Sequence, residues 1–319
     1  GPGAIIGAAV CHLVAWVHCA MAKLLEGLGE EWELEPGDVE IDTRLGDGAS
    51  AEVFSAWWGN QRVATKVLIQ DFSTMNQHTR ESLCRELAIL KSLSHPNIVK
   101  MLAVVPYQPV QIIQELCTGG SLYDLLHEAA EVELTWCQKL KMCTDTCDAM
   151  CYLHGFDPPI IHRDLKSLNL LLANPVVNSH DMPNIKLSDF GLSRLKDSTM
   201  SCVMTRAVGT FHWMAPEVNN GSHYDEKCDV YSYAMIMYEI VCRMVPFEDL
   251  QDLRFLALQV ANGERPSFDA CPVDCPKMLM TLMKVCWHQD PFNRPDFQHV
   301  RRYLDMVVEA ASDSLKAQN

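Results

Sequence analysis

Two short runs near the middle of the chain contain the side chains that could do chemistry. Residues 162–169 read His-Arg-Asp-Leu-Lys-Ser-Leu-Asn, and Asp189-Phe190-Gly191 follows further along. Asp164 offers a carboxylate that can receive a hydroxyl proton, and Lys166 offers a cation for a phosphoryl group. Asn169 and the carboxylate of the second run are hard oxygen ligands of the kind that Mg²⁺ prefers. Together they predict phosphoryl transfer, which depends on positioning and charge neutralisation more than on covalent chemistry.

The segments that must position these groups change in character along the chain. Residues 39–70 alternate in the manner of strands, with a glycine-containing turn inside residues 45–53 and Val63-Ala64-Thr65-Lys66 one strand later. Because side chains alternate across a strand, Ala64 and Lys66 are predicted to lie on one face. A helical pattern dominates from Ser121 onward. This order predicts an α+β protein with a strand-rich first part and a helix-rich second part.

These motifs resemble the eukaryotic protein kinase superfamily over roughly residues 39–309. Residues 162–169 resemble its catalytic loop, Asp189-Phe190-Gly191 its metal-binding motif, and residues 45–53 its glycine-rich loop, with Ala51 in place of a third glycine. The resemblance implies the two-lobed α+β kinase fold, with a small β-rich N-lobe and a larger α-helical C-lobe. It implies ATP and Mg²⁺ as cofactors, with Mn²⁺ as an alternative metal.

The resemblance also assigns roles to individual residues. The expected catalytic residues are Asp164, Lys166, Lys66 and Glu86, with Glu81 as the second candidate for the acidic partner of Lys66. Asn169 and Asp189 are expected to hold the metal. The expected nucleotide-binding residues, with Gln114 as gatekeeper beside the adenine, are Leu45, Gly46, Gly48, Val53, Ala64, Lys66, Gln114, Glu115, Cys117 and Leu171.

Further runs bear on the kind of kinase. Lys166 and residues 209–217 resemble serine/threonine kinases, whereas residues 229–234 and 290–295 resemble the lower lobe of tyrosine kinases. This mixture resembles the tyrosine-kinase-like, Raf-like group. It implies transfer of the ATP γ-phosphate to Ser/Thr hydroxyls of protein substrates in signal transduction. The alternatives are a dual-specificity or tyrosine kinase and, less favoured because the catalytic set is intact, a nucleotide-binding pseudokinase scaffold.

Residues 189–217 correspond to the activation segment of this family. An upstream activating kinase is an expected partner, because Arg163 could pair with a phosphate on this segment. The candidate sites are Ser198, Thr199, Ser201 and Thr205, with Thr205 favoured. Asp229 is expected to anchor the catalytic loop from a buried helix. Glu217 and Arg294 are expected to form an ion pair that braces the activation segment.

Composition limits the other partners and the compartment. The formal net charge of −15 argues against a nucleic-acid partner, because phosphate contacts need clusters of Lys and Arg. The 14 cysteines lack paired metal-binding spacing. Cys143, Cys147 and Cys151 recur at helical intervals, and we interpret them as small buried hydrophobes in a reducing cytosol, not as a metal or redox site. A cytoplasmic location is therefore expected.

Four divisions of the chain are predicted: residues 1–38 as an N-terminal extension, 39–120 as the N-lobe, 121–310 as the C-lobe and 311–319 as a tail. The first residues, Gly1-Pro2-Gly3, are interpreted as either an expression scar or the edge of a fragment. Residues 4–22 contain no Asp, Glu, Lys or Arg, and ~20 apolar residues can span a membrane. Because the run is only mildly apolar, a packed helix is favoured, with membrane association as the alternative. Residues 174–183, rich in Pro and Asn, are predicted to form a surface loop.

Overall fold

The computed structural model describes residues 32–47, 51–70, 74–107, 109–189, 211–250 and 252–316. The apolar run 4–22, Gly48 and the four candidate phosphorylation sites lie outside the described residues. The chain divides into two compact units. Within the described part, the first contains residues 32–94 and 99–116, and the second contains residues 95–98 and 117–316.

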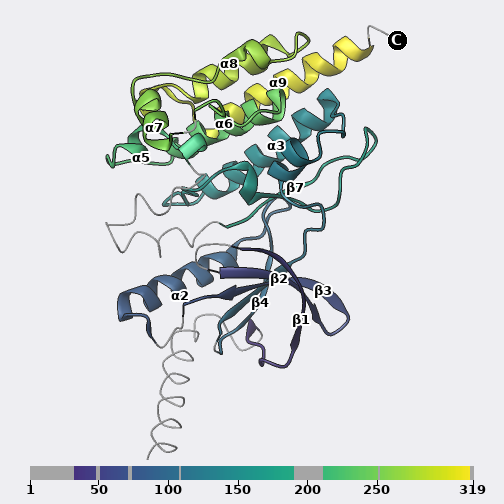
Figure 1. The fold of residues 1–319 in the computed structure, drawn as a ribbon, viewed down its shortest axis with the longest axis vertical. Coiled ribbons are helices and arrows are strands. Elements are labelled where there is room, and N and C mark those ends of the chain that lie inside the picture. The colour runs from purple at the N-terminus through teal and green to yellow at the C-terminus, as the bar shows by residue number, and fades with distance from the viewer. Residues whose placement is uncertain are drawn as a thin grey trace, which may run out of the picture. The chain divides into compact units, whose positions relative to one another are not determined.

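The first unit is built on a five-stranded antiparallel sheet (Figure 1). The strand order is β1-β2-β3-β5-β4. Its strands are β1 (Val39–Asp47), β2 (Ala51–Trp58), β3 (Gln61–Leu68), β4 (Met101–Val105) and β5 (Gln111–Glu115). The two-residue turn after Trp58 contains Gly59 at φ 57°, the left-handed conformation that tight hairpins favour. The alternating sequence of residues 39–70 therefore forms strands, as predicted.

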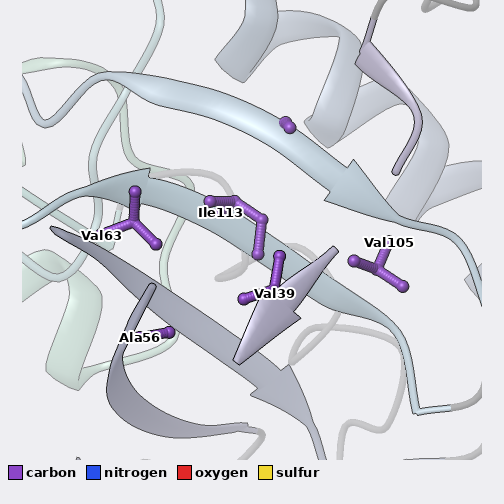
Figure 2. Packing of buried hydrophobic residues seen from close by; sticks show 6 residues of the cluster. Val39, Ala56, Val63, Val105 and Ile113 are labelled. Atoms are coloured by element: carbon purple, nitrogen blue, oxygen red, sulfur yellow. The ribbon is translucent and has the colours of Figure 1, made fainter. Parts of the chain in front are cut away.

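One face of this sheet forms a small apolar core. Its six fully or nearly fully buried side chains, from five strands, are Val39, Ala56, Val63, Ala103, Val105 and Ile113 (Figure 2). β-branched residues dominate the cluster, and they pack well on a pleated surface. This core fixes which face of each strand turns inward, because a shift of one residue would move every side chain to the opposite face.

In the described part of the first unit, one long helix, α2 (Gln77–Ser92), contacts strand β4 of the sheet (Figure 1). Asn76 caps its first turn by accepting a hydrogen bond from the backbone N–H of Thr79 at 2.9 Å. Leu83, Leu87 and Leu90 recur at helical spacing and are buried. The helix thus has one buried face, which also includes Glu86.

The second unit is mainly helical. Its α-helices are α3 (Trp136–His154), α5 (Pro216–Asn219), α6 (Lys227–Cys242), α7 (Leu253–Ala261), α8 (Lys277–Cys286) and α9 (Phe297–Lys316). Short helical turns are η3 (Asp124–Glu128), η4 (Ser167–Asn169), η5 (Phe211–Trp213), η6 (Phe268–Ala270) and η7 (Pro291–Asn293). Strands β6 (Leu170–Leu172) and β7 (Ile185–Leu187) pair with each other.

The centre of the second unit is α6, which packs against α3 and α8 (Figure 1). Residues 228–241 of this helix are all buried, so this stretch of α6 has no solvent face. Helix α3 begins with a capping box between Thr135 and Gln138 and packs on α9 and β7. Any polar side chain on α6 must therefore find its partners inside the protein.

The predicted fold is confirmed in both units: the first is rich in β-strands, and the larger second unit is mainly helical. Among the residues that the structure covers, no helix combines the length and the apolar character needed to cross a membrane.

Candidate active site

Four of the predicted nucleotide-binding residues share one face of the sheet in the first unit. Val53 on β2 lies opposite Lys66 on β3, and Ala64 lies opposite Gln114 on β5. Directly opposed residues in an antiparallel pair point to the same face, as do residues two apart on a strand. The common face of Ala64 and Lys66 is therefore confirmed. It is the face opposite the apolar core around Val63 and Ile113.

Lys66 and Glu86 are both buried, with 7% and 2% of their surface exposed. Lysine and glutamate are almost never buried unless they are paired. The alternative acid, Glu81, lies at the surface, where its Oε2 is 3.3 Å from Arg85 Nη2. This contrast favours Glu86 over Glu81 as the acidic partner of Lys66.

The remaining nucleotide-binding candidates of the first unit lie near the sheet edge and the end of β5. Gly46 pairs with Val53 next to a register shift in β1, and Leu45 is 52% exposed. The backbone N–H of Glu115 donates to the carbonyl of Lys100 at 3.0 Å, and its Oε1 accepts from Lys100 N–H at 2.7 Å. The carbonyl of Glu115 is therefore the backbone group that this residue could offer to a nucleotide.

In the second unit, the catalytic-loop residues lie within direct contact. Lys166 Nζ is 3.0 Å from Asp164 Oδ1 and 3.1 Å from Oδ2. Asn169 Nδ2 donates to the backbone carbonyl of Asp164 at 2.7 Å. This bond fixes the amide nitrogen and leaves the Asn169 amide oxygen as the atom that could face a cation. Cys117 and Leu171, also in this unit, are partly exposed.

The backbone of the catalytic loop is held by Asp229 of α6. Its carboxylate accepts hydrogen bonds from the N–H groups of His162 at 2.8 Å and Arg163 at 2.9 Å, and His154 Nε2 lies 2.9 Å away. Burial alone would raise the pKa of Asp229, but the hydrogen bonds and electrostatic interactions with His154 and His162 outweigh this effect, so the pKa is lowered. The predicted anchor is confirmed.

The β6–β7 pair brings the two metal-binding candidates to one end of a hairpin. Leu170 pairs with Leu187, and just beyond this pair Ser188 N–H donates to the Asn169 carbonyl at 2.8 Å. His162 Nε2 lies 3.0 Å from the Ser188 carbonyl, and this contact connects the residue before Asp189 to the catalytic loop. Asp189 therefore follows directly on a residue bonded to Asn169.

This donor set fits a hard divalent cation. Within the described ranges, no group of three or more His, Cys, Asp or Glu side chains could hold a metal. Mg²⁺ is often bound by one or two protein oxygens together with substrate phosphates, and an amide oxygen plus a carboxylate matches that pattern. The residues fit Mg²⁺ or Mn²⁺ bound together with a nucleotide.

Arg163 and Asp189 adopt unusual backbone conformations, with φ of 67° and 60°. Such left-handed conformations cost of order 1–3 kcal/mol for residues other than glycine and gather at functional sites. Arg163 is anchored directly, because its backbone N–H donates to Asp229. Asp189 follows Ser188, whose backbone N–H donates to the Asn169 carbonyl. The surrounding hydrogen bonds hold both residues in these conformations.

Other expectations for the second unit are also met. Arg294 Nη1 and Nη2 lie 2.6 and 2.9 Å from the Glu217 carboxylate oxygens, which confirms the predicted ion pair. Cys143 and Cys147 are buried, as predicted, whereas Cys151 is only partly buried. Burial raises the pKa of Cys143 to about 12.

Two residues that touch the site were missed by the motifs. His154 contacts Asp229, and Glu239 of α6 contacts Ser167 of the catalytic loop. A signal for Glu239 was present, since it is a lone charge in the apolar run 230–241. His154 carries no comparable signal.

Comparison with known proteins identifies the family to which the chain belongs. Residues 39–304 match the family model for protein tyrosine and serine/threonine kinases. Serine/threonine-protein kinase STY17 of Arabidopsis thaliana is 33% identical over 89% of the chain, and serine/threonine-protein kinase CTR1 of the same plant is 36% identical over 89%. Dual specificity protein kinase splA of Dictyostelium discoideum is 35% identical over 89%.

The chain spans only part of these curated relatives: 47%, 33% and 12% of their respective lengths. The matched segment contains both the sheet with Lys66 and the catalytic loop with Asp164. The predicted superfamily is confirmed, and the chain belongs to the protein tyrosine and serine/threonine kinase family.

Proposed function

We propose that this protein transfers the γ-phosphate of ATP to serine or threonine hydroxyls of protein substrates. The observation that carries the proposal is the contact of Asp164 with both Lys166 and Asn169 on a loop anchored by Asp229. These contacts support the assignment of a proton acceptor, a cation and a metal ligand to one short loop. The names of the serine/threonine kinase relatives support the choice of hydroxyl.

Each residue has a distinct role in the proposed reaction. Asp164 orients the substrate hydroxyl and receives its proton, while Lys166 neutralises charge on the transferred phosphoryl group. Lys66, oriented by Glu86, binds the ATP phosphates. Asn169 and Asp189 hold Mg²⁺ or Mn²⁺, which when bound neutralises charge that develops on the phosphate oxygens.

The nucleotide-binding residues fall into three groups by role. Those proposed to cover the phosphates are Leu45, Gly46 and Gly48. Those proposed to enclose the adenine are Val53, Ala64, Leu171 and the gatekeeper Gln114. Glu115 and Cys117 are proposed to offer backbone hydrogen bonds to the adenine. The lobes that supply them are proposed to span residues 39–120 and 121–310.

The first test is incubation of the purified protein with labelled ATP, Mg²⁺ and a generic Ser/Thr protein substrate, beside an Asp189→Asn variant. Transfer by the wild type alone, with label on Ser or Thr, supports the proposal. Label on Tyr as well would favour dual specificity, which the name of one relative supports. Nucleotide binding without transfer, even after treatment with an activating kinase, would contradict the proposal and favour a pseudokinase scaffold.

Regulation by phosphorylation is part of the proposal. We expect an upstream kinase to phosphorylate the activation segment at one of Ser198, Thr199, Ser201 or Thr205, foremost Thr205, so that Arg163 pairs with the phosphate. Alanine at all four positions should then lower activity. Unchanged activity in that variant would contradict this regulation.

The cellular setting proposed is signal transduction in the cytoplasm. Association with a membrane through residues 4–22 is the competing proposal, and the two predict different outcomes of carbonate extraction. A cytoplasmic protein is released into the soluble fraction, whereas a chain that spans the membrane stays in the pellet.

A further inference from the structure

Glu239 is the most buried acidic residue that the proposed reaction does not use. It lies on α6 with 0% of its surface exposed, among apolar residues of the second unit. An ionised carboxylate in such a place costs several kcal/mol unless hydrogen bonds compensate for the lost water. The identity of its partners therefore shows what the residue holds in place.

The two carboxylate oxygens of Glu239 serve different segments. Oε1 accepts from Ser167 Oγ at 2.7 Å and lies 3.0 Å from His127 Nε2, whereas Oε2 accepts from Trp213 Nε1 at 2.5 Å. A carboxylate can only accept, so the His127 Nε2 must carry a proton. Burial raises the pKa of Glu239, and the hydrogen bonds from His127, Ser167 and Trp213 act against that rise.

The partners of Glu239 come from parts of the chain that matter for the reaction. Ser167 follows directly on Lys166 in the catalytic loop. Trp213 belongs to η5, at the end of the expected activation segment. The turn η5 is fixed further, because the Trp213 carbonyl accepts from Ser232 Oγ at 2.8 Å and His212 Nδ1 lies 2.7 Å from the Pro246 carbonyl.

We propose that Glu239 is a positioning residue that sets the separation of the catalytic loop from residues 211–213 and thereby aligns the substrate hydroxyl with Asp164. This inference rests on the proposed function. None of the three partners of Glu239 is among the residues proposed to bind the nucleotide or the metal. Loss of the Glu239 bonds should therefore impair use of the protein substrate and spare ATP binding.

Two conservative variants separate the two oxygens. Ser167→Ala removes a donor from Oε1, and Trp213→Phe removes the donor from Oε2. For each variant, we expect kcat/KM for a peptide substrate to fall about 10–100-fold, because small misplacement of reacting groups has effects of this order. The KM for ATP should stay unchanged. Since both donors share one carboxylate, their effects in the double variant should not be additive.

Tyr233→Phe provides the matched control. Tyr233 is also on α6 and fully buried, but its hydroxyl donates to the Cys143 carbonyl of α3 at 2.9 Å, not to the catalytic loop. The control loses a buried side-chain hydrogen bond of the same helix that does not involve the catalytic loop. It should lower the melting temperature and leave both KM values and kcat unchanged.

A second readout does not depend on turnover. In Glu239→Gln, the amide retains an acceptor for one segment and loses it for the other, so hydrogen exchange should accelerate in residues 162–169 or 211–215. Tyr233→Phe should show no such acceleration. Wild-type kinetics in Ser167→Ala and Trp213→Phe, or exchange identical to the control, would overturn the inference. Failure of the wild type to transfer phosphate would contradict the proposed function, and the exchange result would still decide the role of Glu239.

Discussion

Lys66 in the first unit and Asp164 in the second are held by different kinds of structure. Lys66 lies within β3, which has a hydrogen-bonded neighbour on each side, β2 and β5. Asp164 lies on a loop that has no such strand neighbours. The backbone N–H groups of the two preceding residues, His162 and Arg163, donate hydrogen bonds to the buried carboxylate of Asp229. Main-chain pairing positions the first residue, and a buried side chain positions the second.

The difference shows why α6 contains buried acids and the sheet core does not. A strand satisfies its own backbone groups through the ladder, so its inner face can be filled by apolar residues such as Val63 and Ile113. A loop beside a buried helix must find other acceptors for its N–H groups. Asp229 of α6 accepts from the N–H groups of His162 and Arg163, and Glu239 of α6 accepts from the Ser167 hydroxyl. Each acid also ties the loop to a second element, through His154 or Trp213.

The strongest test of the comparison is Asp164→Asn. The variant keeps the side-chain shape but loses the proton acceptor, so kcat should fall by ~10²–10⁴-fold. Its unfolding free energy should hardly change, because the loop anchors remain. Asp148→Asn is the matched control: its carboxylate pairs with Arg301 Nε at 2.5 Å and should not affect kcat. An equal loss of kcat in both variants would show that the effect is not specific to the catalytic loop.

Asp229→Asn tests the side-chain anchor. Removing one buried charged acceptor should lower the unfolding free energy by about 3 kcal/mol and should also lower kcat. The pKa of Asp229 is lower in the folded protein than its ordinary value of 3.8, so its contribution is complete above about pH 4 and is lost as the pH falls further. Denaturant unfolding should therefore show a wild-type advantage at pH 7 that shrinks toward pH 3.

An advantage of the wild type over Asp229→Asn that stayed constant from pH 7 to pH 3 would contradict this assignment. It would show that the carboxylate is not stabilised in its charged form by His154 and the loop. If Asp229→Asn kept the kcat of the wild type, Asp164 would not depend on a side-chain anchor. The contrast drawn between Asp164 and Lys66 would then be wrong.

Thr65→Val tests whether the sheet needs a side-chain anchor. The Thr65 hydroxyl donates to Gln111 Oε1 at 3.2 Å in the buried part of the sheet, and its loss should cost about 1–2 kcal/mol of unfolding free energy. Because the ladder holds β3, kcat and the KM for ATP should not change. A substantial fall in kcat would show that Lys66 depends on side-chain contacts as Asp164 does.

Tyr231→Phe should have the smallest effect. Tyr231 is a buried residue of α6 with Arg265 and Arg294 at 5.0 and 5.1 Å from its ring, and in the described part of the chain its hydroxyl has no hydrogen-bond partner. Removing this unpaired group should leave the unfolding free energy unchanged or raise it by up to about 1 kcal/mol. A clear loss of stability would mean that every buried polar group of α6 acts as an anchor.

Local patterns in the sequence were sufficient for much of the site. Strand alternation placed Ala64 and Lys66 on one face, and the motif resemblance led to the Asp229 anchor and the Glu217–Arg294 pair. These features follow from periodicity or from short runs of residues. The common face is local, whereas the anchor and the ion pair join segments 66 and 77 residues apart and were predicted only from the resemblance.

Other features depend on contacts between distant segments. Glu239 meets Ser167 and His127 across 72 and 112 residues of sequence, and no local pattern indicates such pairs. The predicted surface loop 174–183 does expose Val177, yet Gln138 of α3 binds the carbonyls of Asn178 and Asp181 at 2.8 and 2.9 Å. A polar residue near the start of a helix gives no sign of which loop it will hold.

The left-handed backbone at Arg163 and Asp189 has a consequence for protein engineering. Selection for heat resistance alone should favour glycine or asparagine at these positions, since either relieves unfavourable torsion angles. Glycine at 163 would remove the guanidinium, and either replacement at 189 would remove the carboxylate. Variants of this chain selected only for thermal stability should therefore often carry replacements of Arg163 or Asp189 and be inactive. At these two positions, a change that stabilises the fold removes a side chain that activity requires.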